Sequence, residues 1–72
     1  MDYEYLIKNK MVVNHTSASE ELIPLKHCSN FVLIEELLWL YMRAEDGTQD
    51  TAREHYFKMI THELRERIEN NG

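Results

Sequence analysis

Two segments in the second half of the chain have the apolar periodicity of helices. Residues 31–45 carry a dense set of apolar side chains, and Ser29 or Asn30 can cap them at the amino end. Residues 51–69 place apolar side chains on one side and charged ones on the other, as in a helix packed on one face. Gly47, between the segments, suits the left-handed position that ends a helix. The pattern therefore predicts a helical hairpin.

The charges in the second of these segments support the helix. Glu54 precedes Lys58 by four residues, and Glu63 precedes Arg67 by four. On a helix the members of each pair are neighbours, and such a pair stabilises the helix by about 0.2–0.5 kcal/mol. We expect both ion pairs to form.

The N-terminal segment, residues 1–25, fits two patterns. Apolar side chains recur every four residues from Tyr3 to Met11, which favours a short helix. They also alternate from Tyr3 to Ile7, and residues 8–10 could turn the chain back into a second strand as a β-hairpin. The two interpretations stay open.

Further along this segment, Ser17 and Glu20 have the spacing of a capping box. This spacing predicts a short helical turn through residues 20–22. Pro24 should end the turn, because the residue before a proline is disfavoured in a helix.

The expected fold is a single all-α domain of residues 1–72. It consists of the hairpin, residues 31–69, and the N-terminal segment, which packs on the hairpin or on a partner subunit. A chain of 72 residues is small, and domains of this size bury only about 60% of the surface of the unfolded chain. One cysteine, Cys28, excludes an internal disulfide. We therefore expect a homodimer or another homo-oligomer.

The helix of residues 31–45 is apolar around most of its circumference. A helix of this kind is buried on more than one side, and the following helix can cover only one. Either the N-terminal segment or another polypeptide must cover the remaining side, and tryptophan is favoured in interfaces. We call this side the charged strip and predict it as a partner or dimer interface: Val32, Glu35, Glu36, Trp39 and Arg43.

Charge restricts the class of partner. Eight basic and thirteen acidic residues give a net charge of −5, which argues against nucleic acid, because binding it requires a basic face. An acidic chain fits a protein partner with a basic surface. The longest apolar stretch, residues 31–42, is interrupted by Glu35 and Glu36 and predicts no membrane span. With one cysteine and no apparent secretion signal, we expect a cytoplasmic protein.

The histidines and the cysteine form no recognisable reactive site. His55 and His62 are seven residues apart, about 10.5 Å along a helix, which is too far for two ligands of one zinc ion. His27 and Cys28 are adjacent and have no evident third group to orient them. We therefore predict no metal, no cofactor and no catalytic residue, and expect that the chain is not an enzyme.

These observations favour a small acidic protein-binding regulator, inhibitor or adaptor of bacterial or phage type, acting through a helical hydrophobic surface. The alternative is a dimeric DNA-binding transcription regulator. Its reading helix would present four basic residues among several glutamates: Arg53, Lys58, Arg65 and Arg67. A metalloprotein or an enzyme is the less favoured third class.

Overall fold

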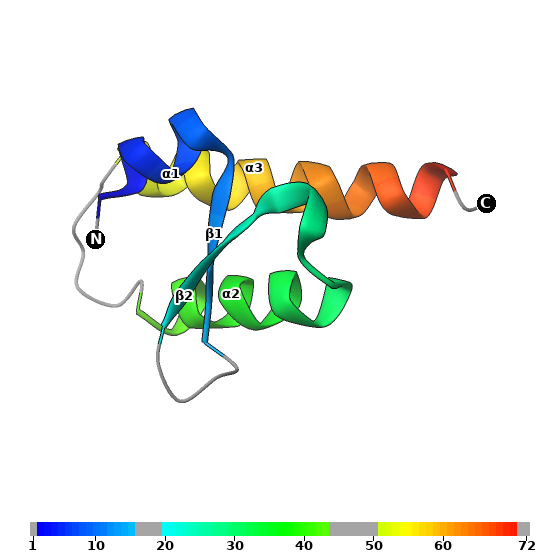
Figure 1. Cartoon of the computed structure of the whole chain (residues 1–72), viewed down its shortest axis with the longest axis horizontal. Helices are drawn as coiled ribbons and strands as arrows, with labels where there is room; N and C mark the ends of the chain where they lie inside the picture. Colours follow the sequence, from blue (N-terminus) through cyan, green and yellow to red (C-terminus); the bar gives the residue numbers. More distant parts are fainter. Residues whose placement is uncertain (1, 16–19, 44–50, 71–72) are drawn as a thin grey trace.

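The computed structural model describes residues 2–15, 20–43 and 51–70. These residues form three α-helices and a two-stranded antiparallel sheet (Figure 1). In chain order the elements are α1 (Tyr3–Asn9), β1 (Met11–Asn14), β2 (Glu21–Pro24), a 3-10 turn η1 (Leu25–His27), α2 (Asn30–Met42) and α3 (Thr51–Asn70).

The chain starts with a short capped helix. The Asp2 side chain accepts a hydrogen bond from the Tyr5 N–H at 3.1 Å, which caps α1. Lys10 ends the helix in the left-handed conformation, with φ of 53°, and its N–H bonds to the Ile7 carbonyl at 3.2 Å. The chain then leaves directly as β1, so the helical interpretation of this segment is correct as far as Asn9.

The prediction of an all-α fold is wrong, because β1 pairs with β2. Met11 lies opposite Pro24, and Asn14 lies opposite Glu21. The predicted helical turn at residues 20–22 is also wrong, since β2 occupies most of it, and Ser17 of the expected capping box lies outside the described residues. The strand partner of β1 is therefore β2, so the alternative interpretation, a β-hairpin with residues 3–7, is wrong.

The predicted start of α2 is confirmed. The Ser29 hydroxyl accepts a hydrogen bond from the Val32 N–H at 3.2 Å, which satisfies one of the free amides at the helix start. The helix ends at Met42, earlier than the predicted residue 45. Gly47, which was expected to end it, lies outside the described residues.

The prediction for α3 is confirmed almost to the residue, since the helix spans Thr51–Asn70. Both predicted ion pairs are present. Lys58 Nζ lies 3.6 Å from Glu54 Oε1, and Arg67 Nε lies 2.9 Å from Glu63 Oε2.

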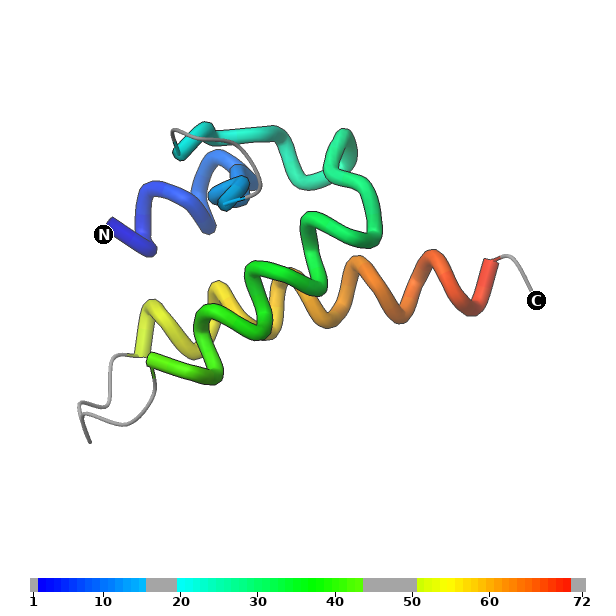
Figure 2. Tube along the Cα trace, turned by 90° about the horizontal axis from the view of Figure 1, so that it is seen from below, coloured from blue at the N-terminus to red at the C-terminus, as the bar shows by residue number. Residues whose placement is uncertain are grey.

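The N-terminal segment packs on the helical hairpin. The strands run between α1 and α2, and α3 passes behind them (Figure 1). Seen from below, α2 crosses in front of α3, and the C-terminal turns of α3 extend beyond the other elements (Figure 2). Buried side chains form one core, and Ile23 of β2 packs against it: Leu6, Val12, Val13, Leu25, Cys28, Leu33, Leu40, Tyr56 and Ile60.

Candidate functional site

A buried carboxylate connects three elements. Glu36 on α2 is only 3% exposed. Its Oε2 accepts a hydrogen bond from the Tyr56 hydroxyl of α3 at 2.5 Å, and its Oε1 lies 2.8 Å from Nε2 of His15, just after β1. The Tyr56 hydroxyl in turn accepts a hydrogen bond from the Val13 N–H at 3.1 Å. Both oxygens of Glu36 are therefore paired inside the protein.

The electrostatics fix the role of each group. Burial raises the pKa of Glu36, while the hydrogen bonds from Tyr56 and His15 act in the opposite direction. Burial, together with the hydrogen bond to Glu36, raises the pKa of Tyr56 as well. Tyr56 therefore keeps its proton at neutral pH and acts as the donor to Glu36.

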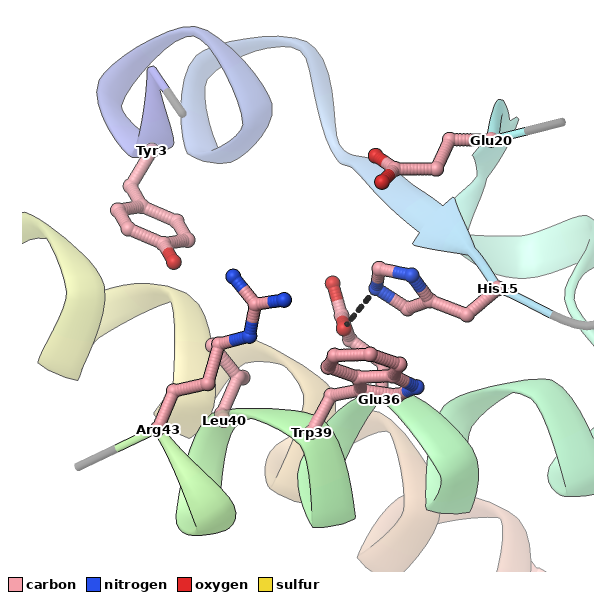
Figure 3. A pocket seen from close by; sticks show the side chains of 7 residues that line it. All are labelled: Tyr3, His15, Glu20, Glu36, Trp39, Leu40 and Arg43. Carbon is pink, nitrogen blue, oxygen red and sulfur yellow. Dashed lines mark hydrogen bonds and ion pairs between the residues drawn. The ribbon is translucent and has the colours of Figure 1, made fainter. Parts of the chain in front are cut away.

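A small cavity opens beside this cluster (Figure 3). The His15 ring stacks on Trp39 with centroids 4.8 Å apart, and the Arg43 guanidinium lies 4.7 Å from the centroid of the Trp39 ring. Tyr3 from α1 and Glu20, just before β2, also line it (Figure 3). The cavity measures about 90 Å³, well below the ~300–1,000 Å³ of sites that enclose organic ligands.

The structure separates the members of the charged strip. Glu36 lies in the interior, Val32 and Glu35 are half-buried, and Arg43 is exposed. Trp39 keeps 38% of its surface exposed, because His15 of the N-terminal segment covers one face of its ring. The N-terminal segment thus covers part of the strip. That Trp39 and Arg43 contact another chain stays a prediction.

A second polar network lies where α2 begins and packs against the C-terminal half of α3. The buried Glu63 accepts hydrogen bonds from Lys26 Nζ at 2.7 Å and from Arg67 Nε at 2.9 Å. The hydrogen bond from Lys26, together with that from Arg67, lowers the pKa of Glu63. Arg67 also donates to the Cys28 carbonyl and to Asn30 Oδ1, both at 2.8 Å. The network joins η1 and the start of α2 to α3.

The residues with metal-binding or nucleophilic side chains stay apart. His55 and His62 are exposed, and Nε2 of His62 lies 3.0 Å from Oε1 of Glu66. Within residues 2–15, 20–43 and 51–70, no three His, Cys, Asp or Glu side chains are placed to share a metal ion. Cys28 is buried, and burial raises the pKa of its thiol. This thiol is therefore held in its less reactive, protonated form.

Five large, exposed apolar side chains lie together on one face of α2. Each exposes between 47% and 76% of its surface. They lie opposite the buried side of α2, which carries Leu33, Glu36 and Leu40. We call this set the outer face of α2: Phe31, Ile34, Leu38, Tyr41 and Met42.

Seen from below, no described helix or strand lies in front of α2 (Figure 2). The sequence analysis recognised that the helix is apolar around most of its circumference. It predicted the charged strip, however, and not the outer face, as the interface. The available signal was the spacing of Phe31, Ile34, Leu38 and Tyr41, which alternates between three and four residues.

No family model, curated protein or solved structure matches this chain. None of the described helices is long and apolar enough to cross a membrane. We therefore infer the function from the geometry of the described residues.

Proposed function

We propose that this chain is a small acidic, non-enzymatic protein-binding protein of the regulator, inhibitor or adaptor type, and that it binds an apolar helix on the outer face of α2. The observation that carries the proposal is the gathering of five large apolar side chains on the open side of one helix. Such a patch is costly in water unless a partner covers it.

The size of the outer face supports this proposal. Large side chains have on the order of 200 Å² of accessible surface, so the exposed fractions give roughly 600–700 Å² for the five residues. The largest apolar patch on a typical monomer is about 300–600 Å². The outer face of α2 therefore lies at or above the upper end of what isolated proteins expose.

The polar clusters favour binding over catalysis. Both oxygens of Glu36 and the hydroxyl of Tyr56 are already used within the protein. The cavity beside them is too small for most organic substrates. These groups serve to hold β1, α2 and α3 together, and so to keep the outer face of α2 rigid.

The basic residues of α3 do not favour the DNA-binding alternative. Arg67 binds Glu63 and backbone carbonyls, and the Arg53 guanidinium binds the Leu40 carbonyl. Lys58 lies 3.6 Å from Glu54. Three of the four candidate DNA contacts are thus engaged within the chain, and DNA binding stays the less supported alternative.

We further propose the cytoplasm as the compartment, because a chain with one buried, unpaired cysteine suits a reducing environment. The net charge of −5 favours basic surfaces in any contact outside the outer face of α2.

Site-specific photocrosslinking tests the proposed binding surface. A benzoylphenylalanine in place of Tyr41 lies on the outer face of α2, whereas one in place of Lys58 lies on the exposed polar side of α3. In the cells that make this protein, we expect crosslinking to a polypeptide from position 41, its loss with Leu38→Glu, and none from position 58. A folded chain that crosslinks to no protein from position 41 would contradict the proposal.

A further inference from the structure

We infer that the helix bound by the outer face of α2 is α2 of a second copy of this chain, packed antiparallel across a two-fold axis. This inference rests on the proposed function and names the partner for the same surface. It is carried by the spacing and the area of the outer face.

The spacing makes the face self-complementary. Phe31, Ile34, Leu38 and Tyr41 follow the 3-4-3 pattern of a coiled-coil seam. With the axis midway between Ile34 and Leu38, Phe31 faces the partner's Tyr41 and Ile34 faces the partner's Leu38. Every large side chain of the seam then meets another large side chain, as an isologous interface requires.

The area fits a stable dimer. The outer face of α2 presents roughly 600–700 Å² per chain, and a standard protein interface buries about 800 Å² per partner. A pair of copies joined through this face alone therefore approaches the size of a standard interface.

The charge of the chain predicts how salt acts on this contact. None of the five side chains of the outer face is charged, although Glu35 lies beside Phe31 and Leu38 on the helix surface. Two chains of −5 repel each other elsewhere, and salt screens that repulsion. Association through the outer face should therefore strengthen as the salt concentration rises, the opposite of a contact between acidic and basic surfaces.

Sedimentation of the purified full chain tests the inference. The wild type should form a dimer of twice the 8.7 kDa chain mass at micromolar concentration. Leu38→Glu should weaken the dimer at least about 30-fold, since central interface residues have effects of this size. Ile68→Glu is the matched control, because it puts the same charge on another exposed apolar side chain. Ile68 is 71% exposed on α3, away from the outer face, and Leu38 is 50% exposed. The control should leave the dimer unchanged.

Disulfide trapping tests the antiparallel direction. In a Cys28→Ala background with helicity checked by circular dichroism, a mixture of Phe31→Cys and Tyr41→Cys chains should form a crosslinked pair on mild oxidation. Phe31→Cys alone should not, because two copies of position 31 would lie about 15 Å apart along the helix axis, beyond the ~7 Å reach of a disulfide. Rapid crosslinking of Phe31→Cys alone would indicate a parallel pair and overturn the inference.

The two proposals fail in different ways. A wild type that stays monomeric at high micromolar concentration, or a dimer that Leu38→Glu does not weaken, overturns the second copy as the partner. If position 41 still crosslinks to a different protein in cells, the proposed binding surface stands. If position 41 crosslinks to nothing, the proposed function fails as well.

Discussion

The Tyr56 hydroxyl donates a 2.5 Å hydrogen bond to Oε2 of Glu36, and this contact joins α3 to α2 inside the core. The same hydroxyl accepts the Val13 N–H from β1. One oxygen atom therefore satisfies a strand amide and a buried carboxylate, two groups that are costly to bury without partners.

Removing the Tyr56 hydroxyl should lower the free energy of unfolding. Tyr56→Phe keeps the ring but leaves the Val13 amide and Glu36 Oε2 each without a hydrogen bond in the interior. We expect a loss of about 2–4 kcal/mol in the free energy of unfolding, measured by urea denaturation. Tyr5→Phe, at an exposed position of α1, should change it by less than about 0.5 kcal/mol. Equal stability of the two variants would show that the hydroxyl contributes little.

Glu36 should make stability depend on pH in an unusual direction. Because burial raises its pKa in the folded chain above the ordinary value of 4.5, folding favours the protonated carboxyl. The stabilisation from this group is complete below about pH 4.5 and is lost as the pH rises through the raised pKa. Glu36→Gln removes the titration, although His15, Tyr56 and Glu20 still surround the site.

The free energy of unfolding of Glu36→Gln, relative to that of the wild type, should therefore increase between pH 4.5 and neutrality. Denaturation curves of both chains over this range measure it. A relative free energy of unfolding of Glu36→Gln that decreases with rising pH would mean that the ionised carboxylate stabilises the fold.

Glu63 should make stability depend on pH in the opposite direction to Glu36. The hydrogen bond from Lys26, with that from Arg67, lowers its pKa, so the ionised form stabilises the folded chain. This contribution is present above about pH 4.5 and is lost as the pH falls through the lowered pKa. Glu63→Gln should cost on the order of 1–3 kcal/mol at neutral pH, and the gap to the wild type should narrow towards pH 3. A gap that stays constant over that range would contradict this role.

The end of α1 offers a stabilising change. Lys10 holds a left-handed backbone conformation with φ of 53°, which is strained for any residue with a Cβ atom. Lys10→Gly should raise the free energy of unfolding by about 0.5–1 kcal/mol. Lys8→Gly, two residues earlier within the helix, should lower it by about 1 kcal/mol. Thermal melting of the two variants compares them, and destabilisation by both would show that Lys10 makes a contact that outweighs its strain.

The helices were predictable because their signals are local. The periodicity gave α3 nearly to the residue, and the Ser29 cap is a side-chain interaction across three residues. The sheet was missed for a physical reason. Val12 and Val13, which point to opposite faces of β1, are both fully buried. The strand therefore lacks the alternation of polar and apolar residues that would have revealed it, and β2 has only four residues.

The candidate site was harder to predict, because it depends on distant partners. The sequence analysis assigned Glu36 to an interface on the charged strip, whereas the structure buries it inside the chain. Only Tyr56, twenty residues away, together with His15 makes this burial possible. The 3-4-3 spacing of the outer face was present in the sequence. Which side of α2 stays open, however, is decided by where β1 and α3 pack.

The central claim is that the outer face of α2 packs antiparallel on a second copy. Isotope-filtered nuclear Overhauser spectra of a mixture of labelled and unlabelled chains test it most directly. We predict cross-chain contacts between the Phe31 ring of one chain and the partner's Tyr41 ring, and between Ile34 and the partner's Leu38. Cross-chain contacts between the two Phe31 rings, or none at a concentration where sedimentation shows a dimer, would contradict it.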